Sequence, residues 1–409
     1  MKRMIVLALV VAAAAATAAA TSSGGVATLA SAGKTTAACG SVPNVAPNDP
    51  KHLLAKLPRA VRSIYNGYST KIVPSAYAAW KPKHKAPYTV GIVMDALANP
   101  SQTAQFNSLQ ADLKASKLVK NVIAVSAKTG GDAAGELQLY QSVIQQGADL
   151  VILQPTSPPA FVQAIAAAAK QGVATISTNS PIDSPYAVNV VPNAYVGPAL
   201  ALSNLLRGMG GSGNLLEVHG IPSTSVDQAT FATFAKVLAN CPNVKVVGEI
   251  DGNFAPPAVK AAVLGFLATH PGSIDGVVQT AVMGPPIIQS FIQAGRPVPS
   301  ITDNVTSAGV LAYWAAHASS GFVAPGFAGG TNDSSNLVTR VAFRMLVGQG
   351  VKLNTIIWHQ PQITKANFQK FVDPSWTIDT PGNLEEPPST YTKDSVLDGL
   401  FNHPSIKTK

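Results

Sequence analysis

A buried strand followed by a polar loop and a helix recurs along this chain, and this repeat restricts the possible folds more than any other feature. Its first copy is YTVGIVMDALANP at residues 88–100, where an apolar run over residues 90–94 ends at Asp95 and the Asn99-Pro100 loop leads into a helical stretch. Short apolar runs that alternate with helix-length segments are typical of parallel strands covered by helices on both faces. Ligands of such folds bind beyond the carboxyl ends of the strands. The sequence therefore predicts an α/β protein with a ligand site built from strand-end loops.

The expected elements fall into two successive groups of similar size. The first has strands at 90–94, 122–125, 150–153, 174–177 and 188–191, with helices at 102–116, 133–146 and 159–171. The second has strands at 214–218, 244–250, 276–279, 300–302 and 321–327, with helices at 195–208, 225–238, 258–269, 285–293, 308–317 and 336–347. Neither group carries a dinucleotide fingerprint. This pattern predicts two lobes with a cleft between them.

The N-terminal residues have the organisation of a secretion signal. Lys2 and Arg3 form a positive start, residues 5–20 are an apolar, alanine-rich run, and small residues follow at 18–20 and 30–32. This pattern predicts a cleaved signal peptide within residues 1–38 and an exported protein of the cell envelope. The alternative is an uncleaved anchor, although the run is short for a bilayer crossing of ~20 residues.

The chain has two cysteines, Cys39 and Cys241. Thr36-Ala37-Ala38 before Cys39 resembles a bacterial lipobox, which makes Cys39 a candidate for lipidation. Thr36 departs from the large aliphatic residue usual at that position, and Lys34 lies close to the cleavage point. The alternative is a Cys39–Cys241 disulfide, which an oxidising exterior allows.

The formal net charge of +9 is concentrated near the N-terminus. Residues 39–87 hold eight lysines and arginines against one aspartate, whereas residues 88–409 hold 18 basic and 19 acidic residues. The body is therefore close to neutral, which argues against a nucleic-acid partner. We interpret residues 39–87 as a basic linker and arm that packs on the body through Tyr65, Tyr68, Tyr77 and Trp80, with a short helix around 50–65. Residues 379–409 are interpreted as a C-terminal tail.

Motifs for catalysis and metal binding are absent from the sequence. The seven histidines show no ligand spacing, and no paired-cysteine motif or G-x-S-x-G elbow occurs. The glycine-rich stretch at 210–213 precedes a strand, so it is a loop and no phosphate cradle. We therefore expect no enzyme activity, no cofactor and no metal.

Several phrases in order along the chain together resemble one known family. They are TVGIVMDALANP, QSVIQQGADLVILQPTSP at 141–158, GVATISTN at 172–179, HGIPSTS at 219–225, NVKVVGEIDGNF at 243–254 and LATHPGSIDGVV at 267–278, followed by a strand that ends in Asp303. Over residues 88–372 the chain resembles the ribose/galactose-type (type I) periplasmic substrate-binding proteins of bacterial ABC importers.

The resemblance implies an α/β, type I periplasmic-binding-protein fold, with two doubly wound parallel-sheet lobes joined by a three-strand hinge. Its crossovers are expected near Pro192, Gly329 and Trp358. Residues 88–192 plus 329–357 would form the N-terminal lobe, and residues 193–328 plus 358–378 the C-terminal lobe. In this family the ligand binds between the lobes, and hinge closure buries it.

The resemblance also places candidate ligand-binding residues at the loops. They are Asn99, Gln102, Thr178, Asn179, Gln228, Phe254 and Asp303. The usual sugar clamp is largely replaced, because Ser101 and Gln102 stand where aromatic rings are expected and no arginine is evident. Each candidate also has a structural alternative: Asn99 and Asp303 as helix caps, Asn179 as a turn residue and Phe254 as a core residue.

The remaining amides and hydroxyls suit a neutral sugar, polyol or sugar-like solute, and Asp303 would also suit an amine. The function implied by the resemblance is an extracytoplasmic solute-binding subunit that delivers its ligand to ABC permease subunits. The expected chain is a monomer, and its only expected contact with the membrane is a lipid anchor at Cys39, if that residue is lipidated and not paired with Cys241. The alternative is a receptor of the same fold that feeds a membrane sensor kinase or chemoreceptor. A transcription regulator of this fold would need a helix-turn-helix where the signal peptide and arm stand.

Overall fold

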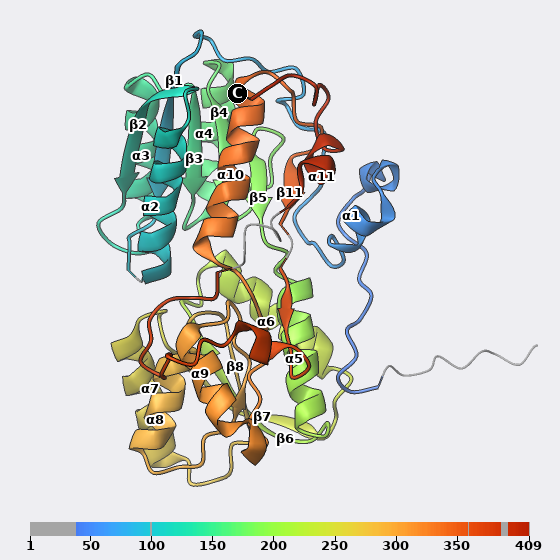
Figure 1. Cartoon of the computed structure of the whole chain (residues 1–409), viewed down its shortest axis with the longest axis vertical. Helices are drawn as coiled ribbons and strands as arrows, with labels where there is room; N and C mark the ends of the chain where they lie inside the picture. Colours follow the sequence, from blue (N-terminus) through green and yellow to red (C-terminus); the bar gives the residue numbers. More distant parts are fainter. Residues whose placement is uncertain (1–37, 99, 359, 386–391, 409) are drawn as a thin grey trace, which may run out of the picture. The chain divides into compact units, whose positions relative to one another are not determined.

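Six parallel strands form the first sheet (Figure 1), in the order β11–β5–β4–β3–β1–β2. Their bounds are Tyr88–Met94 for β1, Val119–Ser126 for β2, Leu150–Gln154 for β3, Ala174–Thr178 for β4, Val188–Val191 for β5 and Thr355–Ile357 for β11. The structure is a computed structural model that describes residues 38–98, 100–358, 360–385 and 392–408, all within the compact unit Ala37–Lys409. Residues 1–37 of the expected signal peptide, and Asn99, lie outside the described residues.

Helices cover both faces of this sheet, which is why its strands are apolar on both sides. Helices α2 (Pro100–Ala115) and α10 (Thr331–Leu346) pack on one face, where Ile92 joins a core with Leu109 and Leu337. Helices α3 (Ala133–Gln145) and α4 (Pro158–Lys170) cover the other face, where Val93 joins a core with Tyr140 and Phe161. Neighbouring residues of one strand thus enter opposite cores, as the two-residue period of a strand requires.

Four parallel strands form the second sheet, in the order β7–β6–β8–β9. They are β6 (Gly213–His219), β7 (Val244–Asp251), β8 (Gly276–Gln279) and β9 (Ser300–Ile301). Helices α5 (Val196–Gly208) and α6 (Ser225–Leu238) pack as one pair, and α7 (Pro256–Thr269) and α8 (Gly284–Gln293) as another, with α9 (Ala308–His317) against α8. The short 3-10 helix η2 (Ala318–Ser320) follows α9. A second one, η3 (Phe368–Phe371), packs against α9.

The chain passes three times between the elements of the two sheets (Figure 1). The passages lie between β5 and α5, between β10 (Gly326–Phe327) and α10, and between β11 and β12 (Gln362–Ile363). Strands β10 and β12 pair with each other in antiparallel fashion. These passages fall near Pro192, Gly329 and Trp358, as predicted, and the two-sheet α/β architecture is the predicted one.

Several elements differ from the expectations in length; β2, for example, extends over 119–126 where 122–125 was expected. The strand expected at 321–327 is reduced to the two residues of β10, and α10 begins at Thr331, five residues before the expected start. The helix expected around 50–65 is divided into η1 (Leu53–Lys56) and α1 (Arg59–Ser63). The division falls at Pro58, because proline has no backbone N–H to donate and restricts the conformation of the residue before it.

The N-terminal arm is packed on the first sheet's core. Tyr65, Tyr68 and Tyr77 are buried there, and the Tyr65 hydroxyl donates to the carbonyl oxygen of Thr355 at 3.1 Å. The Trp80 indole N–H donates to the carbonyl oxygen of Gly172 at 3.1 Å. These are the aromatic residues through which the sequence predicts packing.

A disulfide joins Cys39 of the arm to Cys241, in the turn between α6 and β7. Of the two alternatives for Cys39, this is the second. A sulfur held in a disulfide cannot also carry a thioether-linked lipid, so a lipidated Cys39 is incompatible with this structure.

Within the expected C-terminal tail, the described residues 379–385 and 392–408 are packed against the two cores. Leu397 and Phe401, at and beyond helix α11 (Asp394–Asp398), are buried in the first sheet's core, whereas Leu384 is buried in the second. Arg344 of α10 pairs with Asp394 at 2.9 Å and with Asp398 at 2.8 Å. The segment is polar in composition, but a few buried apolar residues anchor it to the two cores.

Among the described residues, no helix has the length and hydropathy that a bilayer crossing needs.

Candidate functional site

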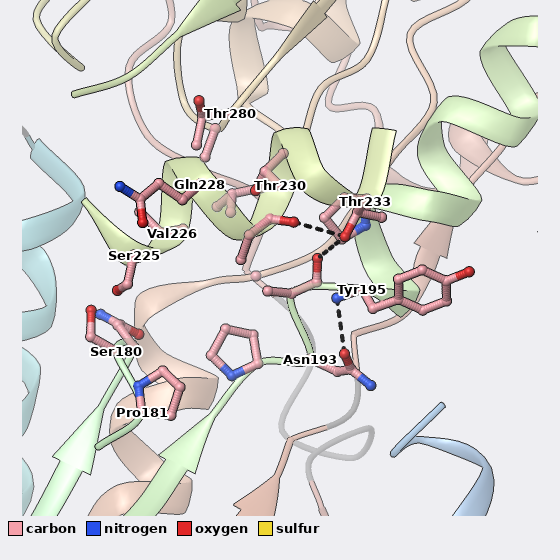
Figure 2. A pocket seen from close by; sticks show the side chains of 18 of the residues that line it. Ser180, Pro181, Asn193, Tyr195, Ser225, Val226, Gln228, Thr230, Thr233 and Thr280 are labelled. Atoms are coloured by element: carbon pink, nitrogen blue, oxygen red, sulfur yellow. Dashed lines mark hydrogen bonds between the residues drawn. The ribbon is translucent and has the colours of Figure 1, made fainter. Parts of the chain in front are cut away.

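A cavity of about 750 Å³ lies where strand-end loops of the two sheets face each other. Figure 2 shows Ser180 and Pro181, which follow β4 of the first sheet, across from Ser225, Gln228 and Thr230 of α6. A volume of this size suits a small organic molecule. Its position at the carboxyl ends of parallel strands is where open α/β sheets bind ligands.

The lining combines amides and hydroxyls with aromatic rings and few charges. The polar members include Ser101, Gln102, Gln105, Gln154, Asn179, Asn193, Gln228, Thr230, Thr233, Thr280, Gln360 and Asn383. The aromatic members are Tyr68, Tyr195, Phe254, Phe327 and Trp358, and the charged members are Asp183 and Lys236. Amides and hydroxyls both donate and accept hydrogen bonds, so this wall can pair with ligand hydroxyl groups.

Asn179 is held in place on the first-sheet wall by a short chain of hydrogen bonds. Its Nδ2 donates to Oε1 of Gln105 at 2.7 Å, and Nε2 of Gln105 donates to the hydroxyl of Ser334 at 3.3 Å. The backbone of Asn179 has φ 62°, in the left-handed region that asparagine tolerates better than most residues. The loop after β4 is therefore fixed by side chains of α2 and α10.

The second-sheet wall is built mainly on helix α6. Gln228 donates through Nε2 to the carbonyl oxygen of Pro222 at 3.3 Å, and Thr233 donates to the carbonyl oxygens of Ala229 and Ala194 (Figure 2). Lys236 places its Nζ 5.6 Å from the ring centroid of Tyr195. A cation over an aromatic face is attracted by the negative surface of the ring. The one lysine of this wall is therefore engaged with Tyr195.

Strained backbone is concentrated around the cavity. Four lining residues other than glycine have positive φ: Asn179, Phe254 (53°), Val282 (55°) and Val305 (59°). For a β-branched residue such as valine this conformation is an outlier that costs ~1–3 kcal/mol. Strain of this kind is typical of functional sites, where the surrounding structure enforces a particular loop geometry.

Two polar atoms of lining residues are buried without a hydrogen-bond partner among the described residues, namely Oε1 of Gln154 and Nε1 of Trp358. Buried polar atoms are nearly always paired, so unpaired ones beside a cavity are consistent with a ligand or water partner.

The structure brings four of the seven sequence candidates to the cavity: Gln102, Asn179, Gln228 and Phe254. Thr178 is fully buried beneath Asn179 and does not line the cavity. Asn99 lies outside the described residues, although Ser101 and Gln102 just after it are lining residues.

Asp303 is the clear departure from the expected site. It is fully buried, and its carboxylate accepts from the backbone N–H of Ser307 at 2.7 Å, the Ser307 hydroxyl at 3.2 Å and Nε2 of Gln279 at 3.1 Å. Burial raises the pKa of Asp303 to about 7, partly offset by these hydrogen bonds. The structure thus gives Asp303 the role of its structural alternative, holding the turn that precedes α9.

Several lining residues could not be recognised from strand-end spacing. Residues 67–70 come from the arm, Asn383 from the C-terminal segment, and Asn193, Tyr195, Trp358 and Gln360 from the crossovers. Such residues reach the cavity only through tertiary packing. The one usable signal was the expected position of the crossovers.

Comparisons with known proteins agree with this architecture. Residues 90–348 match the family model described as periplasmic binding protein domain. The chain is 26% identical over 256 residues to the xylitol-binding protein of Mycolicibacterium smegmatis, covering 62% of this chain and 72% of that protein.

Solved structures share the fold at low identity. An ABC transporter solute-binding protein from Thermobispora bispora superposes with a TM-score of 0.64 at 22% identity, covering 74% of this chain and 98% of that one. A solute-binding protein from Bacillus halodurans with bound myo-inositol gives a TM-score of 0.62 at 14% identity, covering 71% and 98%.

These matches confirm the predicted fold class and a binding function in place of an enzymatic one. The family is extracytoplasmic, in agreement with the expected location outside the cytoplasm. A match over most of the body, joined to the two-sheet architecture and its cavity, makes this chain a member of the periplasmic binding protein domain family.

Proposed function

We propose that this protein captures a neutral sugar or polyol between its two sheet-based lobes and delivers it to an ABC permease. The observation that carries the proposal is the cavity itself, because its wall is rich in amides and hydroxyls and has one acidic and one basic side chain. Hydroxyl-rich ligands need many paired donors and acceptors and no net counter-charge.

The names of the relatives support the same ligand class. The Mycolicibacterium smegmatis relative is a xylitol-binding protein, and the Bacillus halodurans structure contains myo-inositol. Both ligands are polyols without a charge. The aromatic side chains of the cavity add flat apolar surface for the C–H groups of such a ligand.

Delivery to a permease requires that the loaded form differ from the empty one. The three passages between the sheets can act as a hinge, and ligand that touches both walls would favour the closed form.

We place the mature protein outside the cytoplasmic membrane as a monomer, after removal of residues 1–38 as a signal peptide. The Cys39–Cys241 disulfide supports a form without lipid at Cys39.

The ligand class is tested by thermal shift and calorimetric titration. Xylitol, myo-inositol, ribose and allose should raise the melting temperature, whereas amino acids, polyamines and carboxylates should not. Saturable binding of a charged solute with no response to any polyol or sugar would contradict the proposal.

The intact mass of the exported chain tests the state of Cys39, because a lipid on Cys39 adds mass that a Cys39–Cys241 disulfide does not.

The first prediction concerns Gln228, a lining residue on α6. Gln228→Met keeps the side-chain length but removes the amide, so it should weaken binding of the identified ligand by roughly ten- to a hundredfold. Gln110→Met, on α2 and outside the cavity lining, is the matched control and should leave the dissociation constant unchanged. Equal affinities for both variants would remove Gln228 from the ligand site.

A further inference from the structure

Two glutamates and a histidine gather on the second sheet, outside the cavity lining. Glu217 and His219 lie two residues apart on β6, and Glu249 lies opposite Glu217 in the parallel register with β7. One ligand atom of each residue lies within 4.8 Å of the others. Glu217 and His219 are partly buried, whereas Glu249 is exposed on the edge strand.

The charges of this group are not balanced by the chain itself. Among the described residues, no lysine or arginine forms an ion pair with Glu217 or Glu249. Like charges directly opposite each other on neighbouring strands are destabilising. Asp227, which bonds His219, and Asp251, the register partner of His219 on β7, add further negative charge. A cation at this place would remove the repulsion.

A carboxylate and an aromatic ring hold the side chain of His219 in place. Its Nδ1 lies 2.7 Å from Oδ2 of Asp227, and its ring stacks on Phe231 with the centroids 3.5 Å apart. Asp227 is itself buried and accepts from the backbone N–H of Gly220 at 2.7 Å and from the hydroxyl of Thr280. A proton held on Nδ1 by a carboxylate leaves the lone pair on Nε2, which is the usual arrangement of histidine ligands backed by an acid.

We propose that Glu217, His219 and Glu249 form a binding site for one divalent transition-metal ion such as Zn²⁺, separate from the solute cavity. Two carboxylate oxygens and one imidazole nitrogen are ligands that zinc accepts, with water completing the coordination. Asp227 positions His219 without touching the ion. Asp227 also bonds Thr280, a lining residue of the cavity. Through His219 and Asp227, the bound ion would therefore help to fix the position of Thr280.

The test uses the full mature chain without an affinity tag, stripped with EDTA and titrated with ZnCl2 by calorimetry. We expect one ion per chain and a rise in melting temperature with added zinc, because an ion that binds the folded form stabilises it. Co²⁺ in place of zinc should give visible absorption bands that report bound nitrogen and oxygen ligands.

Glu249→Gln is the main variant, because an exposed side chain on an edge strand can be changed without disturbing the core. It should weaken zinc binding by roughly tenfold or more, and Glu217→Gln should do the same. Asp251→Asn is the matched control: it removes the same charge from β7, opposite His219 in the register, but leaves the three ligands intact. Its zinc affinity should change less than threefold.

Three results would overturn the site. These are no stoichiometric zinc binding, unchanged affinity in both glutamate variants, or an equal loss in Asp251→Asn, which would indicate general attraction to negative charge.

Discussion

At the scale of single residues, Asp303 shows that a position at the end of a strand does not by itself decide whether a side chain contacts ligand. The sequence places a carboxylate after a strand of the second lobe, where a ligand contact and a helix cap are both reasonable. The two roles differ only in the direction of the side chain. The structure turns it toward Ser307 and Gln279, inside the lobe. Asn179 and Phe254 follow strands in the same way but face the cavity.

The second prediction follows from this placement. Asp303→Ala should lower the free energy of unfolding by ~2–3 kcal/mol, because it leaves the buried N–H groups of Ser307 and Gln279 without an acceptor. Ligand affinity of the folded variant should stay within twofold of the parent. Chemical denaturation and calorimetric titration of the same preparation measure both quantities. Normal stability combined with a large loss of affinity would restore Asp303 to the ligand site.

At the scale of elements, the strands and helices of the two sheets could be predicted closely because short apolar runs and turn residues alternate regularly. The start of α10 could not. The backbone N–H groups of Thr331 and Asn332 donate to Oε1 and Oε2 of Glu385 at 2.8 and 3.0 Å. The cap of this helix therefore comes from the C-terminal segment, more than fifty residues later, and no local pattern contains it.

The third prediction tests that remote cap. Glu385→Gln removes the charge and Glu385→Ala removes the side chain, so stability should fall by ~0.5 and ~1 kcal/mol respectively. The measurement is urea unfolding at neutral pH. Asp379→Ala, an exposed acid of the same segment that bonds Gln289, is the control and should change stability by less than 0.5 kcal/mol. A loss of equal size in all three variants would indicate a general effect of the segment's charge.

At the scale of the whole described unit, two segments outside the matched family region bind both cores. The arm is fixed to the second core by the Cys39–Cys241 disulfide and to the first by its buried tyrosines. The C-terminal segment contributes Leu384 to the second core and Phe401 to the first. Sequence patterns identified the arm's aromatic anchors but missed the C-terminal ones, since isolated apolar residues in a polar segment carry little periodic signal.

The fourth prediction concerns the disulfide. Replacing both cysteines by serine should lower the free energy of unfolding by ~2–4 kcal/mol, because the bond closes a loop between residues 202 positions apart and restricts the unfolded chain. Reduction of the parent protein should reproduce the effect, while the reductant should not change the melting temperature of the double variant. Coincident melts of the oxidised parent and the double variant would contradict it.

The strand order of the first sheet has a consequence for the newly made chain. The strands of the second sheet all lie within residues 213–301, so the ribosome has supplied every one of them before the protein is complete. The first sheet must wait for β11, and its core also takes Leu397 and Phe401, which are made later still. The half that is synthesised first is thus finished last. Until then β5 lacks its outer neighbour β11, and the part of the core that packs on Leu397 and Phe401 is uncovered, which makes the incomplete chain prone to aggregation.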